Sequence, residues 1–278
     1  MKVSILGIDG FMGRLIGRLA LEQKLTICAG FTIQGSKNIG LDIGTMLGFA
    51  EIEEKIQDST DLIAKIQKAN PDVVIDFTIG VATEKNIPPI LELGIPTVIG
   101  TTGLSIQFKE EIKRICESKK VSAVLASNMA TGVNTFFELA RYLAYMLKEQ
   151  NWDVEVIEKH HNRKKDSPSG TALTIAEKVA QGLGIKLEDS AVYGRNKGMN
   201  PRKLGSAEIG IHAIRAGDIV GEHTVIFAGQ GERIEITHRA HSRECFAKGT
   251  ITAALFINNH PKEGKIFDMQ EVLGIESD

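Results

Sequence analysis

Short apolar runs alternate with helical patterns through the first half of this chain, beginning at a glycine turn near the N-terminus. The run at 3–6 ends in Gly7-Ile8-Asp9-Gly10-Phe11-Met12-Gly13, and apolar residues then repeat at helical spacing from Leu15 to Ala20. Further strand patterns lie at 26–31, 73–77, 97–99 and 121–126, separated by helix patterns near 60–69, 82–93 and 106–118. Strands that alternate with helices in this way predict an α/β fold with a parallel, doubly wound sheet.

The glycine turn suits a Rossmann-like dinucleotide site. Glycines three residues apart allow a tight turn, a close approach of pyrophosphate to the backbone, and a helix packed hard on its strand. A glycine turn can also open a helix that binds nothing, and the repeated strand–helix units favour the nucleotide interpretation. Two turns at strand ends, 76–78 and 100–103, carry hydroxyl and glycine residues where such sheets bind ligands. Either turn also suits a plain strand-to-helix connection.

Composition excludes several other classes of protein. The 278 residues suffice for two modest domains, and a formal net charge of −2 gives no nucleic-acid footprint. The longest apolar runs are strand-sized, which argues against a membrane protein. Cys28, Cys116 and Cys245 are widely spaced and form no CxxC pair, so neither a disulfide framework nor a zinc site is expected. With no leader pattern at the N-terminus, the expected location is the cytoplasm.

The segment 158–171, EKHHNRKKDSPSGT, combines two histidines, three cations and a turn that opens a helix. Ser167 is expected to be the N-cap, with Pro168 at the first helical position. The N–H groups near Ser169, Gly170 and Thr171 would then face an anion at the positive helix end. A solvated basic loop before a surface helix is the competing interpretation. The paired histidines favour a dianion site beside a histidine acid.

The same segment closely resembles the signature of the dihydrodipicolinate reductase family, E-x-H-H-x-x-K-x-D-x-P-S-G-T-A, at every fixed position. The resemblance extends to the D-F-T and G-T-T-G turns, to the hinge at 127–134, and to R-x-G-x-x-x-G-x-H at 215–223. It implies reduction of a small cyclic dicarboxylate in lysine (diaminopimelate) biosynthesis by NADPH or NADH, without a metal. It also implies a homotetramer. A dinucleotide-binding domain is expected at 1–127, completed by 244–278, and a substrate and tetramerisation domain at 128–243.

The candidate site residues follow from these motifs and this resemblance. The catalytic residues are His160, the proton donor, and Lys164, and the substrate-binding residues are His161, Ser169, Gly170 and Thr171. The cofactor-binding residues are Gly7, Asp9, Gly10, Phe11, Met12, Gly13, Arg14, Thr32, Phe77, Thr78, Gly100, Thr101, Thr102, Gly103, Ser127, Asn128 and Met129. No metal is expected at His212, His223, His238 and His241, which lack a compact ligand spacing.

One position departs from the expected pattern. A carboxylate normally ends the second strand and binds the ribose hydroxyls, whereas this chain has Thr32. Without that charge, and with Arg14 or Lys37 nearby, NADPH is expected to serve at least as well as NADH. Two rival functions remain open. One is another Rossmann oxidoreductase, such as an aspartate-semialdehyde or sugar dehydrogenase, and the other is a catalytically silent dinucleotide-binding regulator.

The second half has a different pattern. Strands are expected at 153–159, 208–215, 219–228 and 233–239, a long loop at 184–206, and a final helix at 246–257. This order predicts a smaller α+β domain around a mixed sheet of about four strands, with one face covered by helix.

Overall fold

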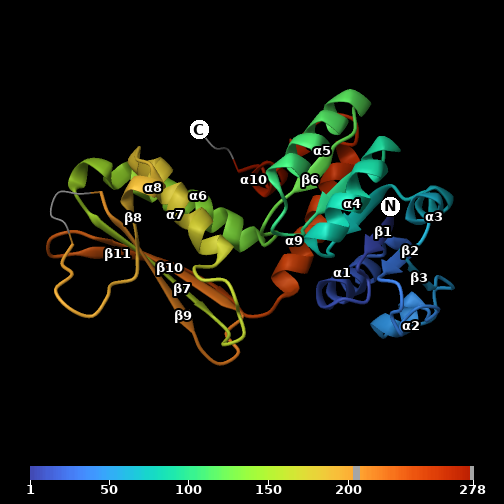
Figure 1. Ribbon diagram of the computed structural model, residues 1–278, viewed down its shortest axis with the longest axis horizontal. Helices are drawn as coiled ribbons and strands as arrows, with labels where there is room; N and C mark the ends of the chain where they lie inside the picture. Colours follow the sequence, from blue (N-terminus) through green and yellow to red (C-terminus); the bar gives the residue numbers. More distant parts are fainter. Residues whose placement is uncertain (203–206, 276–278) are drawn as a thin grey trace. The chain divides into compact units, whose positions relative to one another are not determined.

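The computed structural model describes residues 1–202 and 207–275, and these fall into two compact units (Figure 1). Among the described residues, the first unit is Met1–Thr131 together with 244–275, and the second is Gly132–Arg243. The chain passes from the first unit to the second after Thr131 and returns to the first at Glu244. Parts of the expected loop (203–206) and of the C-terminal segment (276–278) lie outside the described residues.

The first unit is built on a seven-stranded sheet with the order β12-β6-β5-β4-β1-β2-β3, and all of its pairings are parallel. Its strands are β1 (Lys2–Leu6), β2 (Thr26–Thr32), β3 (Ile56–Asp58), β4 (Val73–Asp76), β5 (Thr97–Ile99), β6 (Ala123–Leu125) and β12 (Ile266–Phe267). Its helices are α1 (Phe11–Glu22), α2 (Ile43–Leu47), α3 (Leu62–Ala69), α4 (Gly80–Glu92), α5 (Ile106–Lys119), α9 (Glu244–Asn259) and α10 (Met269–Val272). The predicted doubly wound sheet is confirmed.

Both faces of this sheet are buried, which explains the nearly continuous apolar runs of its strands. On one face, Ile5 packs in a cluster with residues of α1 and α9, including Ile16 and Ile251. On the other, Leu6 packs with residues of α3, α4 and α5. From β1, the strands β2 and β3 extend to one side of the sheet, and β4, β5 and β6 extend to the other. Open α/β sheets bind ligands at such a switch point in the strand order.

The second unit has a five-stranded mixed sheet with the order β11-β10-β7-β9-β8. Its elements are α6 (Thr131–Leu147), η1 (Lys148–Gln150), β7 (Asp153–His160), α7 (Gly170–Leu183), α8 (Leu187–Ser190), β8 (Ala191–Tyr193), β9 (Ile209–Arg215), β10 (Gly221–Ala228) and β11 (Arg233–Ala240). The helices lie on one face of the sheet (Figure 1). The fifth strand, β8, lies within the expected loop, because three residues are too few to show a periodicity.

Strand β7 alternates between a buried and a half-buried face, and its buried residues include Glu158 and His160. In the register of the sheet Glu158 lies opposite His223 of β10 and Ala213 of β9. The pleat therefore places a carboxylate and two histidines on the face that the helices cover.

The start of α7 corrects one sequence expectation. Ser169, and not Ser167, is the N-cap, and its hydroxyl accepts the N–H of Ala172 at 3.2 Å. The Ser169 N–H donates to the buried carboxylate of Glu158 at 3.0 Å, which holds this residue in an extended conformation before the first turn. The helix consequently begins at Gly170, two residues after Pro168.

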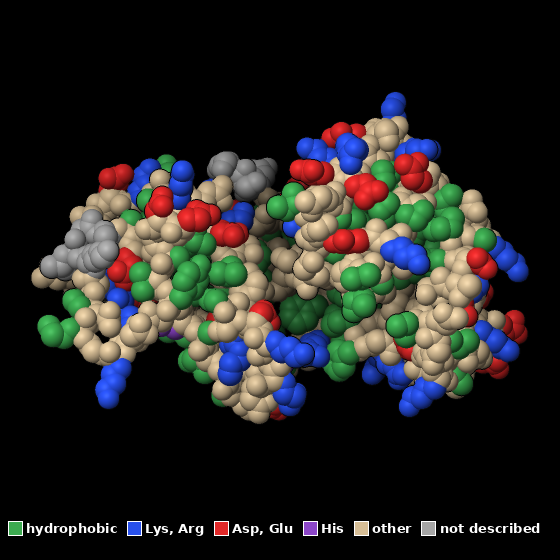
Figure 2. All heavy atoms as spheres, in the orientation of Figure 1, with side chains coloured by type: hydrophobic (Ala, Val, Ile, Leu, Met, Phe, Trp, Pro, Cys, Tyr) green, Lys and Arg blue, Asp and Glu red, His purple; other side chains and the backbone are tan. Residues whose placement is uncertain are grey.

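Figure 2 shows basic, acidic and apolar side chains interspersed over the visible face of both units. Among the described residues, no helix combines the length and the hydrophobicity that a bilayer crossing requires.

Candidate active site

The glycine turn after β1 is held tightly against the sheet. Gly7 has φ +81°, and its N–H donates to the carbonyl of Phe31 at 2.8 Å. A Cβ at Gly13 would overlap the carbonyl oxygen of Gly7, so only glycine lets α1 pack this closely on the turn. Gly10 precedes α1 without a side-chain cap, which leaves the positive helix end directed at the turn. This backbone cradle fits a dinucleotide pyrophosphate.

A cavity of about 370 Å³ opens beside the turn, at the switch point of the sheet. Six predicted cofactor residues line it: Gly7, Asp9, Gly10, Thr32, Phe77 and Thr78. Four others lie on the first turn of α1: Phe11 and Arg14 are exposed, Met12 is half-buried and Gly13 is buried. The turn and the cavity lie together at the carboxyl ends of the strands, which is where such sheets bind dinucleotides.

A buried carboxylate that the sequence analysis did not single out joins the two other predicted turns. Asp76, the last residue of β4, accepts hydrogen bonds from the hydroxyls of Thr78 (2.8 Å), Thr83 (2.5 Å) and Thr101 (2.9 Å). Burial raises the pKa of Asp76 although the three hydroxyls oppose this effect. The hydroxyls of Thr78 and Thr101 are thus engaged within the protein, where they fix the carboxyl ends of β4 and β5. Asp76 is the first residue of the D-F-T motif, so the sequence contained the basis for including it among the candidate residues.

The remaining predicted cofactor residues lie in the turn after β5, shortly after β6, and just before α6. A Cβ at Gly100 would overlap the ring of Phe77, so this glycine makes room for a neighbour, and Thr102 and Gly103 are exposed in the same turn. Ser127 is exposed after β6. Asn128 accepts the N–H of Ala130 at 3.0 Å, and Met129 is buried with its carbonyl against Gly249 of α9.

In the second unit, the fully buried Glu158 is the centre of a hydrogen-bond network. Its carboxylate bonds Nδ1 of His160 at 2.5 Å, accepts the N–H of Ser169, and accepts two bonds from the guanidinium of Arg215 at 2.7 and 2.8 Å. Burial opposes ionisation of Glu158, but the hydrogen bonds from His160, Arg215 and Ser169 outweigh it and lower the pKa to about 2. This carboxylate joins β7, β9 and the start of α7. Arg215 was absent from the predicted site, although the R-x-G-x-x-x-G-x-H motif contains it.

The network orients His160 by binding one of its two ring nitrogens. Because Nδ1 is held by Glu158, Nε2 is the nitrogen left for chemistry. A Cβ at Gly221 would lie 3.1 Å from this Nε2, so glycine keeps the space beside it open. The ring of His223 packs edge-on against His160 with centroids 5.2 Å apart. Burial lowers the pKa of His223 to about 3, so this second ring stays neutral.

The other predicted substrate residues surround the start of α7. Lys164 is half-buried and its Nζ lies 2.9 Å from a carboxylate oxygen of Asp166, whereas Arg163 and Lys165 are exposed. The pKa of His161 is lowered by desolvation and by neighbouring cations, with Arg163 first among them. A Cβ at Gly170 would meet no atom within 4 Å, which leaves room for a ligand at this helix end. Thr171 follows in the first turn, half-buried.

The Ser169 N–H does not have the predicted role. It was expected to face a bound anion, but it donates to Glu158 instead. Ser169 therefore caps α7 and anchors the histidine network. Of the residues predicted to bind an anion through their backbone, Gly170 and Thr171 lie in the first turn of α7.

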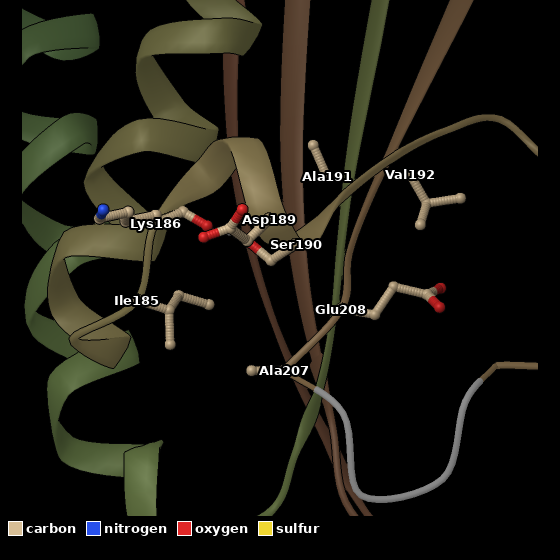
Figure 3. Close-up of a pocket in the computed structure, with 8 residues that line it drawn as sticks. All are labelled: Ile185, Lys186, Asp189, Ser190, Ala191, Val192, Ala207 and Glu208. Carbon is tan, nitrogen blue, oxygen red and sulfur yellow. Dashed lines mark hydrogen bonds between the residues drawn. The ribbon is translucent and has the colours of Figure 1, made fainter.

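A second cavity, of about 550 Å³, lies elsewhere in this unit, between α8, β8 and the start of β9 (Figure 3). None of the predicted site residues lines it. In Figure 3 the carboxylate of Glu208 points away from Ile185 and Asp189, and it pairs with Arg195. Within residues 1–202 and 207–275, no group of three His, Cys, Asp or Glu side chains could hold a metal ion.

The doubly wound sheet with its glycine turn, and the histidine-bearing mixed sheet, define a two-domain dinucleotide-dependent oxidoreductase. Two family models match the chain: "Dihydrodipicolinate reductase, N-terminus" over residues 1–129 and "Dihydrodipicolinate reductase, C-terminus" over residues 132–273. The chain belongs to the dihydrodipicolinate reductase family.

Individual relatives agree with this assignment. The chain is 41% identical over 276 residues to the 4-hydroxy-tetrahydrodipicolinate reductase of Methanothermobacter thermautotrophicus, covering 99% of both chains. It is 43% identical over 276 residues to the enzyme of the same name from Ralstonia pickettii, covering 99% of this chain and 100% of the other. A solved structure of dipicolinate-bound dihydrodipicolinate reductase from Paenisporosarcina sp. TG-14 shares the fold, with a TM-score of 0.75, 22% identity and 98% coverage of each chain.

Proposed function

We propose that this chain reduces 4-hydroxy-tetrahydrodipicolinate to tetrahydrodipicolinate with NADH or NADPH, in the diaminopimelate route to lysine. The observation that carries the proposal is the buried carboxylate of Glu158, which binds the candidate acid His160, Arg215 and the cap of α7 together. Relatives that are 41–43% identical over nearly their whole length bear the name of this activity.

The dinucleotide would be held by the first unit. The glycine turn at Gly7–Gly13 and the first turn of α1 would bind its pyrophosphate. The turns that Asp76 fixes, at the ends of β4 and β5, would flank its nicotinamide half. When bound, the reduced nicotinamide supplies the hydride that adds to the ring of the substrate.

The dianionic substrate would be bound by residues at the positive end of α7. Lys164 offers a cation, and His161, three residues earlier, offers an imidazole whose lowered pKa favours the neutral form. The open space at Gly170 lets a carboxylate approach the backbone of Gly170 and Thr171. The structural relative described above was solved with dipicolinate bound, which supports a pyridine-type dicarboxylate as the ligand class.

His160 would complete the reaction by donating a proton. Hydride addition leaves negative charge on the substrate, and a positioned imidazole can neutralise that charge near neutral pH. Glu158 positions the ring through Nδ1, and Gly221 leaves Nε2 accessible to the substrate. One hydride and one proton account for the two-electron reduction, and the 4-hydroxyl group of the substrate leaves as water, which completes the conversion to tetrahydrodipicolinate.

The rival functions are less well supported. An aspartate-semialdehyde dehydrogenase needs a nucleophilic cysteine, but Cys116 is fully buried in α5 and burial raises its pKa to about 12. A silent regulator would not need an assembled histidine–carboxylate–arginine network. We therefore favour catalysis.

The proposed enzyme is a cytoplasmic homotetramer. The face of the mixed sheet opposite the helices presents the partly exposed Ile157, Ile214 and Ile226. These isoleucines lie among charged and hydroxyl side chains, including Lys159 and Glu222, and a face of this mixed kind can pack on a second copy. Light scattering of the purified chain measures the subunit number directly.

The activity is tested by following nucleotide absorbance while a synthase supplies the substrate. The His160→Gln variant should lower kcat by roughly 10²–10⁴, the usual contribution of a general acid. The exposed His241→Gln variant is the matched control and should turn over normally. Near-normal turnover by His160→Gln would refute the assigned role. Nucleotide binding without turnover by the unmodified chain would identify a regulator.

A further inference from the structure

Asp9 lies in the glycine turn, but its side chain reaches the end of a neighbouring strand. One carboxylate oxygen, Oδ1, accepts the hydroxyl of Thr32 at 2.6 Å. The other, Oδ2, accepts the hydroxyl of Ser36 at 2.7 Å and the amide of Asn38 at 3.0 Å. Three donors from the end of β2 and the turn after it therefore fix this carboxylate.

This contact changes the expectation drawn from Thr32. Thr32 is the last residue of β2, where dinucleotide-binding folds place the carboxylate that binds the adenosine ribose. Thr32 itself is uncharged, but residue 32 is not the only source of charge at this position. A carboxylate is present at the end of β2, but it comes from the glycine turn 23 residues earlier. Asp9 and Thr32 line the same cavity.

The hydrogen bonds leave Asp9 able to act on a ligand. A carboxylate offers about four lone-pair positions, and the three donors occupy three of them. Oδ1 accepts from only one of these three side-chain donors, so it is the oxygen with capacity for a ribose hydroxyl. Although partial burial opposes ionisation, the bonds from Thr32, Asn38 and Ser36 lower the pKa of Asp9, so the group carries its charge at neutral pH.

Nearby cations do not cancel this charge. The Nε of Arg14 donates to the backbone carbonyl of Asp9 at 2.9 Å, which holds that side chain on the turn. Lys37 is exposed between Ser36 and Asn38, and recruiting it to a phosphate would require ordering a long, flexible side chain. The carboxylate, by contrast, is already fixed.

We propose that Asp9 determines cofactor specificity in this chain: its carboxylate accepts a hydrogen bond from the adenosine ribose of NADH and repels the 2′-phosphate of NADPH. This proposal rests on the proposed function, because it requires that a dinucleotide binds at the glycine turn. It adds that the site discriminates between NADH and NADPH. NADH is then the preferred cofactor, contrary to the preference expected from Thr32 alone. Like charges placed side by side in a binding site cost enough to change affinity by more than about tenfold.

Equilibrium binding tests this inference without catalysis. Calorimetric titration of NADH and of NADPH should give the unmodified chain a Kd for NADH at least about tenfold lower. Asp9→Asn keeps the size of the side chain and removes its charge, so the two Kd values should come within about threefold. Asp9→Ser also removes the charge, with a smaller side chain, and should likewise bring the Kd values for NADH and NADPH within about threefold. If Asp9→Asn does not fold, the Kd values of Asp9→Ser test the proposal.

Asp72→Asn is the matched control. Asp72 accepts the N–H of Lys2 at 2.6 Å, at the amino ends of the strands and away from the glycine turn, so its loss should leave the Kd ratio unchanged. Equal affinity of the unmodified chain for both nucleotides, or a ratio unaltered by both Asp9 variants, overturns the proposal. Failure of the proposed function is a separate result: neither nucleotide would then support reduction of the dicarboxylate, whatever the Kd ratio.

Discussion

Replacement of Glu158 by glutamine tests the network that supports the candidate acid. A carboxyl group whose pKa falls from 4.5 to about 2 on folding contributes roughly 3 kcal/mol to stability at neutral pH. Glutamine cannot carry this charge, and it leaves the guanidinium of Arg215 without its two-point partner. We therefore expect Glu158→Gln to lower the free energy of unfolding at pH 7 by about 3 kcal/mol.

The pH dependence gives the prediction its sign. Because the pKa of Glu158 is lower in the folded protein, its contribution is fully present above pH 4.5 and is lost as the pH falls towards 2. The stability gap between the unmodified chain and Glu158→Gln should accordingly narrow over this range.

Urea unfolding measured by tryptophan fluorescence suits this test. The chain has a single tryptophan, Trp152, which packs against Gly229 in the same unit as Glu158. The variant should also show a reduced kcat with an unchanged Kd for the nucleotide, since His160 loses the group that orients it.

Glu155→Gln is the matched control for these measurements. Glu155 lies on the same strand but on its other face, where it pairs with Arg202 at 2.6 Å and His212 at 2.7 Å. Its loss should reduce stability and leave kcat unchanged. The reasoning fails if Glu158→Gln unfolds at the same urea concentration as the unmodified chain at pH 7, or if the gap is as large at pH 2.5.

Two further substitutions separate neighbouring roles. Lys164→Ala should raise KM for the dicarboxylate or lower kcat by at least about tenfold, whereas the adjacent, exposed Lys165→Ala should change neither by more than about twofold; steady-state kinetics of the pair decide this. Gly13→Ala should cost roughly 1–3 kcal/mol and weaken nucleotide binding, because its Cβ overlaps the Gly7 carbonyl. Gly80→Ala should neither reduce stability by this amount nor weaken nucleotide binding, because its Cβ would make only an ordinary 3.5 Å contact. Calorimetric unfolding and nucleotide titration of both variants test the prediction, and equal effects would contradict it.

The sequence by itself determined the architecture, and it supplied the residues of the proposed chemistry. Alternating strand and helix periods predicted the doubly wound sheet, since both periods are local properties of the chain. The glycine spacing predicted the proposed dinucleotide turn, and the segment 158–171 contained the histidines of the proposed site, because these motifs are contiguous. The family followed from the same contiguous residues.

Only the tertiary structure decided which side chains meet. Arg215 binds Glu158 across 57 residues, and Thr101 binds Asp76 across 25. Asp9 supplies the charge that Thr32 lacks. Such contacts depend on strand register and on which strand ends lie side by side, and no local periodicity encodes either. The same long-range contacts placed Glu158 against the N–H of Ser169 and so moved the start of α7 from its predicted residue.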